Sequence, residues 1–250
     1  MIALIAAMTL EAAPVVRRMS VQRREEHGGA QAVVGTLAGA EVALLTSGTG
    51  KEAAAYAARW ALDAFTPKAM LCFGLAGGLR PEAQPSDLVF CSSVIAAANG
   101  ATGRACAADV RLLVRAEDVA AQRRLRYVTG PCVTVSEVVT RPGDKARLGA
   151  AHQADAVEME SWWIAEAAAQ KNVPFLAVRA ISDSVDFRLP DTVSSLGDAH
   201  GNARPLAVMA YLLTHPHHVP LLWRLRRHHL RATQNLASFL EALAPQVALS

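Results

Sequence analysis

This sequence of 250 residues has few charged and few aromatic side chains. Charged residues make up 19% and aromatic residues 5%, whereas 52% of the residues are hydrophobic. A disordered chain has the opposite balance, with few apolar residues and a high net charge. The formal net charge of +3 is also too small to indicate a nucleic-acid-binding protein. We therefore expect a folded protein with a large core of small apolar residues, and no nucleic-acid partner.

Long apolar runs and a basic leader segment are also missing. No stretch is long and apolar enough to span a bilayer. The chain starts with a short apolar run, but no basic segment precedes it and Glu11 interrupts it early. This start indicates a buried first strand rather than a secretion signal, and we expect a cytoplasmic protein.

Cysteine is scarce, with four residues and no C-x-x-C pair. Cys72 and Cys132 lie in apolar strand-like runs, which predicts buried thiols in a reducing compartment. Histidines gather near the C-terminus, at His215, His217, His218, His228 and His229. Adjacent histidines are poor chelators, so we expect these side chains to be solvated and the protein to hold no metal.

No repeat, low-complexity tract or linker interrupts the chain, so we expect a single domain over residues 1–250 with a C-terminal helical extension over 203–250. Apolar strand-like runs alternate with helical patterns. This alternation predicts an α/β fold with a central mixed, mostly parallel β-sheet flanked by helices. The expected strands are 2–7, 31–36, 41–46, 69–73, 87–97, 131–135, 154–157 and 175–181. The expected helices are 10–19, 51–65, a short one from 146, 161–172, 206–213 and 219–243, with a loop at 99–108.

Acids or glycines follow several of these strands. Glu11 follows the first strand, the run Gly74–Gly78 follows a middle strand, and Glu160 and Asp183 follow the last two. Ligands bind at the carboxyl ends of the strands in open α/β sheets, so we expect these residues to meet in one pocket. The glycines let a ligand approach the backbone because they lack a Cβ.

The turn Ser47–Gly50 precedes the helix expected at 51–65. Backbone N–H groups at the start of a helix attract anions and oxygen ligands. We therefore expect an anion or hydroxyl site at Ser47 and Gly48.

At these residues the chain resembles the nucleoside phosphorylase and nucleosidase superfamily. The matching pieces occur in the family's order within residues 1–190: Ala7-Met8-x-x-Glu11, Ser47-Gly48-x-Gly50-Lys51, Gly74-x-Ala76-Gly77-Gly78, Val157-Glu158-Met159-Glu160 and Arg179-Ala180-Ile181-Ser182-Asp183. At Glu11 the chain is most similar to the methylthioadenosine/S-adenosylhomocysteine nucleosidases. In the run Phe73–Gly78 and in its long basic tail it is more similar to the hopanoid-associated phosphorylases, which are thought to release adenine from adenosylhopane.

The resemblance implies an enzyme that cleaves the N-glycosidic bond of a purine nucleoside through an oxocarbenium-like transition state. It assigns Asp183 as the general acid that protonates the leaving base, and Glu11 as the base that activates water. It assigns Glu160 and Met159 to ribose binding. The expected base and nucleophile pocket consists of Ala76, Gly77 and Ser182.

For the substrate, the resemblance favours adenosylhopane in hopanoid lipid biosynthesis. The alternatives are a methylthioadenosine/S-adenosylhomocysteine nucleosidase, or phosphorolysis in place of hydrolysis. No cofactor is expected, and phosphate is a co-substrate only in the phosphorolytic alternative. Because family relatives are oligomers, we expect a homodimer or a larger homo-oligomer.

The chain departs from the nucleosidases in two places. Leu75 stands where they usually have serine, and Glu137-Val138-Val139-Thr140 offers no aromatic residue to stack on the purine. In addition, Asp186 lies just beyond Asp183 and is a rival acid.

Each acid also has an ordinary structural explanation. Glu160 would then be an acid favoured at a helix N-terminus, Asp183 a capping or turn residue, and Glu11 a solvated side chain. Glu158 is expected to be a supporting or surface acid. The alternative to an enzyme is a nucleoside-binding protein on the same fold.

The expected helix at 219–243 combines apolar positions, including Trp223, with several arginines. One interpretation is that its apolar side packs on the domain or on a second subunit. The other is that it lies on an anionic membrane surface. The second interpretation makes the protein peripheral at the inner membrane surface, within reach of a lipid-linked nucleoside.

Overall fold

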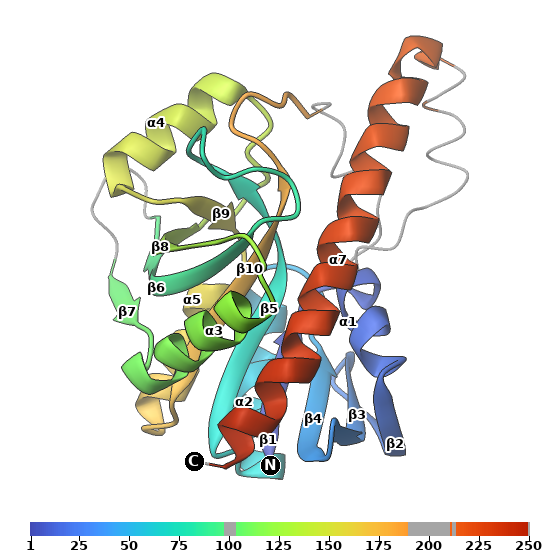
Figure 1. Ribbon diagram of the computed structural model, residues 1–250, viewed down its shortest axis with the longest axis vertical. Coiled ribbons are helices and arrows are strands. Elements are labelled where there is room, and N and C mark those ends of the chain that lie inside the picture. Colours follow the sequence, from blue (N-terminus) through green and yellow to red (C-terminus); the bar gives the residue numbers. More distant parts are fainter. Residues whose placement is uncertain (98–103, 190–210, 212–213, 250) are drawn as a thin grey trace.

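Strands and helices alternate along the chain, as Figure 1 shows. The computed structural model describes residues 1–97, 104–189, 211 and 214–249. Its strands are β1 (Ile2–Ala6), β2 (Met19–His27), β3 (Ala30–Leu37), β4 (Ala40–Thr46), β5 (Ala69–Gly78), β6 (Leu88–Ala96), β7 (Ala105–Ala107), β8 (Tyr127–Thr134), β9 (Ala156–Glu158) and β10 (Phe175–Asp183). Its helices are α1 (Thr9–Val16), α2 (Lys51–Phe65), α3 (Val110–Gln122), α4 (Pro142–His152), α5 (Ser161–Gln170) and α7 (Val219–Ala248).

All these strands belong to one mixed sheet in the order β10-β6-β8-β9-β5-β1-β4-β3-β2, with β7 paired to β6. At the centre, β1 lies parallel to β4 and β5, and β5 lies parallel to β10. Strand β10 also pairs with β6, so the sheet curls back on itself there. The α/β class and the central mixed sheet flanked by helices are confirmed. Antiparallel pairings are as numerous as parallel ones, because the β2–β4 meander and the short strands β7 and β9 add antiparallel neighbours.

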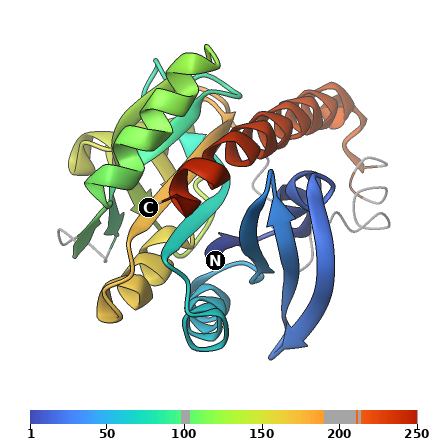
Figure 2. The same cartoon turned by 60° about the horizontal axis from the view of Figure 1, so that its bottom comes forward.

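Side chains of the central strands alternate between two apolar cores. On β10, Val178 belongs to the core that contains α1, α3 and α7, whereas Ala177 and Ile181 belong to the core that contains α2 and α5. The alternation follows from the two-residue period of a strand. Figures 1 and 2 show α3 and α7 on one side of the sheet, and α2 and α5 on the other. Because both faces are covered, the central strands are continuous apolar runs in the sequence.

The structure corrects several boundaries. The helix expected at 10–19 ends at Val16, and β2 begins at Met19. Strand β2 was missed because its side chains are charged and exposed, as suits an edge strand. The expected turn Gly74–Gly78 is part of β5, because β10 pairs with this strand as far as Gly77. Helix α3 and strand β7 were not expected, and α4 begins at Pro142 rather than at 146.

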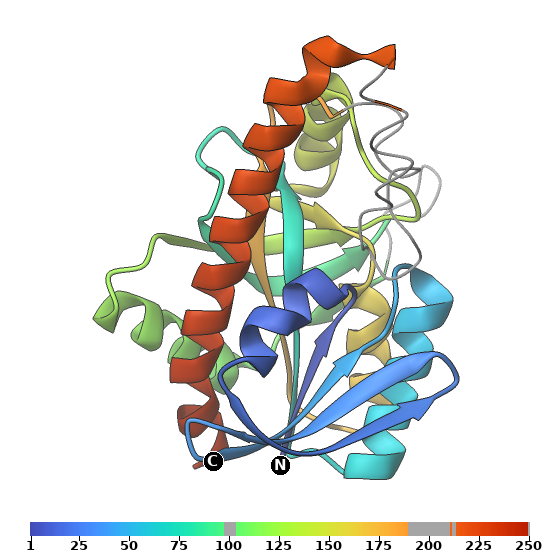
Figure 3. The ribbon, with the colours of Figure 1, turned by 90° about the vertical axis from the view of Figure 1, so that its right-hand side faces the viewer.

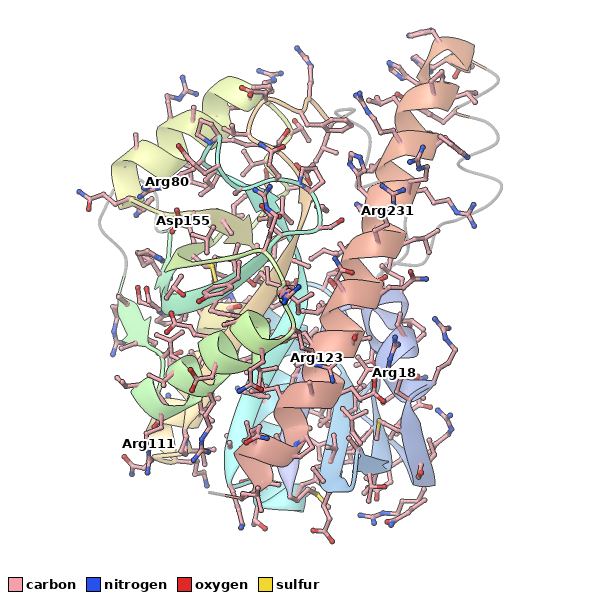
Figure 4. The ribbon with its side chains drawn as sticks, in the orientation of Figure 1. Arg18, Arg80, Arg111, Arg123, Asp155 and Arg231 are labelled. Atoms are coloured by element: carbon pink, nitrogen blue, oxygen red, sulfur yellow. A yellow bond between two sulfur atoms is a disulfide. The ribbon has the colours of Figure 1, made fainter. Side chains whose placement is uncertain are left out.

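The C-terminal half of α7 is part of the core, whereas its first half is more exposed. Phe239 and Leu243 are fully buried. Arg18, which follows α1 and is labelled in Figure 4, pairs with Glu241 of α7 at 3.2 Å. Figure 3 shows that the helix runs along the length of the molecule. The helix expected at 219–243 is therefore confirmed, and it extends to Ala248. The one expected at 206–213 lies outside the described residues, apart from 211.

One expectation about the cysteines is wrong. Cys132 is not a free thiol, because it forms a disulfide with Cys91. The two residues lie on neighbouring strands, β8 and β6, with their Cα atoms 5.6 Å apart, a spacing that a disulfide can bridge. Cys72 is buried and free, and burial raises the pKa of its thiol to about 12. Within the described residues, no helix has the length and apolar character needed to cross a bilayer.

Candidate active site

A cavity of about 260 Å³ lies where β1, β5 and β10 end. Four residues that the sequence predicts to share one pocket line this cavity: Glu11, Gly77, Glu160 and Asp183. The expected neighbours Ala76, Met159 and Ser182 also line it. The other lining residues are Ala7, Met8, Thr49, Leu75, Val135, Val138, Val139, Val157, Glu158, Leu189, Leu225 and His229.

Glu11 comes from the first turn of α1, directly after β1, and is only 2% exposed. One carboxylate oxygen accepts the Met8 N–H at 3.0 Å, and the other accepts the Leu75 N–H at 2.7 Å. Burial raises the pKa of Glu11, although the Leu75 N–H and the Arg179 guanidinium oppose the rise. Glu11 is therefore not a solvated surface acid. A carboxylate that binds protons more readily than in water suits a general base.

Gly74 lets the Glu11 carboxylate lie against β5. A Cβ at this position would meet Glu11 Oε1 and Arg179 Nη1, each at 2.6 Å. Any larger residue would therefore displace one of these two charged groups. The glycine-rich run thus serves the close packing of charged groups beside the cavity rather than a chain reversal.

Glu160 precedes α5 and is 6% exposed. Its Oε1 accepts the Gly50 N–H at 2.9 Å. Gly50 has a φ of 89°, which favours glycine at the start of α2. Burial raises the pKa of Glu160 to about 7, and the neighbouring Glu158 carboxylate adds to the rise. The charge of Glu160 therefore changes near neutral pH.

The expected anion or hydroxyl site at Ser47 and Gly48 gains no support from this arrangement. Neither residue is among those that line the cavity. Their N–H groups donate to backbone carbonyls at the end of β1, at 2.9 and 3.0 Å. The Ser47 hydroxyl lies 2.7 Å from the Gly48 carbonyl oxygen, to which it donates. The turn contributes to the site instead through Thr49, which lines the cavity, and through the Gly50 N–H.

A buried ion pair lies behind the Glu160 side of the cavity. Arg179, which is 1% exposed, contacts the Glu158 carboxylate and donates to Ser161 Oγ at 2.7 Å. Glu158 also accepts the backbone N–H groups of Glu160 at 2.9 Å and of Ser161 at 2.7 Å. Burial opposes the charge on Arg179, but Cys72 and Glu158 raise its pKa overall. The pair fixes the backbone that carries Glu160, so Glu158 is a supporting acid and not a surface one.

Asp183 is the last residue of β10 and is 4% exposed. Its Oδ2 pairs with the ammonium of Lys145 from α4, and its Oδ1 accepts the hydroxyl of Ser182. Lys145 is completely buried. The rival acid Asp186 is exposed and is not among the residues that line the cavity. Asp183 is therefore the better placed of the two acids.

Aliphatic side chains form much of the remaining wall. Val135, Val138 and Val139 line the cavity from the segment where the sequence lacks an aromatic residue. Leu225 and His229 line it from α7. Burial lowers the pKa of His229, and the nearby Asp183 carboxylate works against this.

Sequence reasoning assigned no role to Lys145, Arg179, Leu225 or His229. Arg179 did carry a signal, because it is the single charged residue in the apolar run 175–181, and an isolated charge in a buried strand needs a partner. The other three are far from the motifs in sequence, and only folding brings them to the cavity.

A family model described as the phosphorylase superfamily matches residues 1–209. The match includes every carboxylate of the cavity. The chain belongs to the phosphorylase superfamily. This superfamily member is accordingly an enzyme that cleaves a glycosyl bond, as a nucleosidase or a phosphorylase. Helix α7, with Leu225 and His229, lies beyond the matched residues.

Solved structures share the fold of this superfamily member at low sequence identity. A 5′-methylthioadenosine/S-adenosylhomocysteine nucleosidase from Neisseria meningitidis, in complex with methylthio-immucillin-A, has a TM-score of 0.80 and 23% identity, with 98% of each chain covered. A nucleosidase of the same kind from Colwellia psychrerythraea 34H, in complex with adenine, has a TM-score of 0.77 and 24% identity over 98% of this chain and 95% of that one. Futalosine hydrolase from Helicobacter pylori has a TM-score of 0.78 and 19% identity, with 98% and 97% covered.

The cavity of this superfamily member combines proton-exchanging groups with an apolar wall. Its carboxyl groups can accept hydrogen bonds from hydroxyl groups, and Glu160, with a pKa of about 7, can exchange a proton near neutral pH. Its aliphatic side chains can contact a flat base or an apolar substituent. Within the described part of the chain, no three histidine, cysteine or acidic side chains are grouped so as to hold a metal ion.

Proposed function

We propose that this enzyme hydrolyses the N-glycosidic bond of an adenine nucleoside and releases adenine. The observation that carries the proposal is the convergence of Glu11, Glu160 and Asp183, from three separate elements, on one cavity. Two of the solved nucleosidases that share the fold are complexes with adenine and with methylthio-immucillin-A, which supports an adenine-type ligand.

In the proposed reaction, the bond between C1′ and N9 breaks and its electron pair moves to the base. Asp183 donates a proton to N7, so the base leaves as a neutral molecule. The oxygen of a water molecule adds to C1′, and Glu11 accepts the proton that the water loses. The raised pKa of Glu11 fits this role, because the base must bind a proton at neutral pH.

Glu160 accepts the ribose hydroxyl groups in this proposal, and Met159 packs on the sugar. Acceptance needs the ionised carboxylate, which predominates above a pH of about 7. The interaction strengthens as positive charge develops on the sugar, so Glu160 contributes to turnover as well as to binding. Ala76, Gly77 and Ser182 surround the base and the nucleophile.

Hydrolysis is favoured over phosphorolysis by the charge of the cavity. Glu11, Glu158 and Glu160 all line it, whereas no lysine or arginine is among the described residues that do. Three cations near the N-terminal motifs would favour phosphate: Arg17, Arg18 and Lys51. None of them lines the cavity, and Arg18 pairs with Glu241. A phosphate dianion would meet repulsion here.

The substituent at the 5′ position is proposed to be apolar, as in adenosylhopane, an intermediate of hopanoid lipid biosynthesis. The aliphatic wall of Val135, Val138, Val139, Leu189 and Leu225 supports this proposal. Methylthioadenosine and S-adenosylhomocysteine are the alternative substrates. A homodimer or larger homo-oligomer in the cytoplasm is proposed as well, and light scattering after size exclusion measures it.

The test is a product assay with adenosylhopane, methylthioadenosine and S-adenosylhomocysteine, each with and without phosphate. We expect adenine from adenosylhopane in the absence of phosphate. Adenine from one of the other two nucleosides alone would keep the reaction and change the substrate. A sugar 1-phosphate that forms only with phosphate would establish phosphorolysis. If none of the three nucleosides yields adenine, the proposed function is wrong.

Peripheral membrane contact through the first half of α7 is also proposed. Trp223 is 58% exposed and Leu230 is 48% exposed, and the arginines at 224, 226 and 227 are exposed beside them. Each arginine near an anionic surface contributes about 1 kcal/mol. The charge-reversed variant Arg224/Arg226/Arg227→Glu should therefore no longer cosediment with phosphatidylglycerol vesicles. The control Arg59/Arg123/Arg124→Glu changes the net charge equally elsewhere, and equal binding of the two variants would exclude this contact.

A further inference from the structure

Lys145 differs from every other lysine of the chain. The chain has four lysines, and Lys51, Lys68 and Lys171 are exposed, whereas Lys145 is 0% exposed. A buried ammonium group is costly unless its charge is paired and its protons are hydrogen-bonded. An unpaired lysine at this position would therefore destabilise the fold, and its partners explain why it is tolerated.

All the partners of Lys145 lie at or just after the end of β10. Its ammonium contacts Asp183 Oδ2 and donates to the carbonyl oxygens of Ser184 at 3.1 Å and Phe187 at 3.0 Å. An ammonium group has three protons, so these partners use its full donor capacity. Lys145 thus holds one oxygen of Asp183 in place and joins α4 to the segment that follows β10.

The other titratable groups of the cavity do not balance the charge of Asp183. Glu11, Glu158 and Glu160 carry charge of the same sign when ionised. His229 faces the cavity from α7, but burial lowers its pKa and so favours the neutral ring at pH 7. Ser182 donates a hydrogen bond without charge. Among the described residues, Lys145 is the cation in contact with Asp183.

We propose that Lys145 is the positioning residue of the general acid, fixing Asp183 through Oδ2 and stabilising the carboxylate that remains after Asp183 protonates the leaving base. This inference rests on the proposed acid role of Asp183. In the step, the C1′–N9 electron pair moves to the base, the Asp183 proton moves to N7, and Lys145 keeps its own protons. The Lys145 charge lowers the energy of the product side of this proton transfer.

A double-mutant cycle separates this role from a structural one. We expect Lys145→Met to lower kcat by about 10- to 100-fold, the range of coupling between contacting charges, with a smaller change in KM. In the Asp183→Asn background the same substitution should change kcat by no more than about twofold. If Lys145 only ties α4 to Ser184 and Phe187, Lys145→Met should lower kcat by the same factor in both backgrounds. Lys171→Met is the matched control at an exposed lysine.

The pH profile gives a second readout. Without the Lys145 charge, Asp183 keeps its proton to higher pH. The alkaline fall of kcat should therefore move upward by about one pH unit or more in Lys145→Met and in Lys145→Gln. Lys145→Gln keeps a donor for the carbonyls, so it distinguishes loss of charge from loss of the loop contacts. An unchanged profile in both variants would refute the inference.

A readout without turnover keeps the inference independent of the proposed function. In protein labelled with ¹³C at aspartate carboxyl groups, Asp183→Asn identifies the signal of Asp183. We expect that signal to titrate at higher pH in Lys145→Met than in the wild type, by about one pH unit or more. If the wild type cleaves none of the three nucleosides but this change in titration occurs, the proposed function fails and the charge coupling stands. If the wild type is active and no such change occurs, the inference fails alone.

Discussion

The two sides of the cavity each contain a buried cation, but they use it differently. On one side Arg179 pairs with Glu158, which holds the backbone of Glu160 and Ser161. On the other side Lys145 pairs directly with Asp183, the proposed general acid. The first cation therefore supports the site from behind, and the second contacts a candidate reacting group.

This difference teaches how one cavity can hold carboxyl groups with different tasks. Burial raises the pKa of Glu160 to about 7, and the Glu158 charge adds to the rise, while the Arg179 charge opposes it. The hydrogen bonds that Glu11 accepts come from the backbone N–H groups of Met8 and Leu75 rather than from a cation. Burial is the main cause of its raised pKa as well. Asp183 has its charge balanced by contact. The carboxyl groups that line this cavity therefore differ in the charged groups that contact them.

The largest expected effect is on the Lys145 side. Asp183→Asn keeps the shape but removes the proton donor, so we expect kcat to fall by about 10²–10⁴-fold, the usual contribution of general acid catalysis. KM should change less, because the amide still forms hydrogen bonds. Single-turnover adenine release measures the chemical step. Asp186→Asn, at an exposed acid, is the control, and wild-type turnover in Asp183→Asn would remove the acid role.

The next effect concerns the Arg179 side and falls on stability. Glu158→Gln leaves the Arg179 charge buried without its partner, and removal of one member of a buried pair costs about 3–5 kcal/mol. Urea unfolding at pH 8 measures this loss. Glu166→Gln is a suitable control, because Glu166 pairs only at 3.7 Å with Arg104, which is 85% exposed. A loss for Glu158→Gln as small as that of the control would show that Arg179 is not a structural cation.

A smaller effect tests the proton affinity of Glu160. In the folded protein its pKa of about 7 lies above its ordinary value of 4.5, so its stabilising contribution is complete below pH 4.5 and is lost as pH rises through 7. Because a pKa difference of one between the folded and unfolded states corresponds to about 1.4 kcal/mol, the wild type should lose up to roughly 3 kcal/mol relative to Glu160→Gln over this pH range. Urea unfolding across pH 4.5–8 gives the difference.

Catalysis should change with pH in the opposite direction. Ribose binding needs the ionised Glu160, so kcat/KM of the wild type should rise toward pH 7. Glu160→Gln should lower both binding and turnover, because ribose contacts strengthen as charge develops on the sugar. If the difference in the free energy of unfolding between the wild type and Glu160→Gln does not change with pH, the pKa of Glu160 is not raised in the folded protein.

The sequence predicted one side of this comparison better than the other. Glu11, Glu160 and Asp183 were visible because each follows an apolar strand, and strand ends share an edge of the sheet. Arg179 was recognisable as an isolated charge in the buried run of β10. Lys145 gave no local signal, because it lies 38 residues before Asp183 on a helix of ordinary composition. Strand β2 was missed for a related reason, since its charged pattern reflects exposure at a sheet edge and hides its pairing with β3.

The smallest effect compares two serines, one on each side of the cavity. Ser182 donates to Asp183, whereas Ser161 accepts from Arg179 and is not among the residues that line the cavity. A hydrogen bond to a charged group contributes about 1.5–3 kcal/mol. On the Asp183 side the lost hydrogen bond should lower kcat, because Ser182→Ala removes a donor to Asp183, which becomes a carboxylate when it gives up its proton. We expect kcat to fall by roughly tenfold or more, with an alkaline limb at higher pH. Ser161→Ala should instead lower the free energy of unfolding, by about 1–3 kcal/mol, and leave the shape of the pH profile unchanged. Steady-state kinetics and urea unfolding of both variants give all four values. If Ser161→Ala shifts the pH profile and Ser182→Ala does not, the division of roles between the two buried cations is reversed.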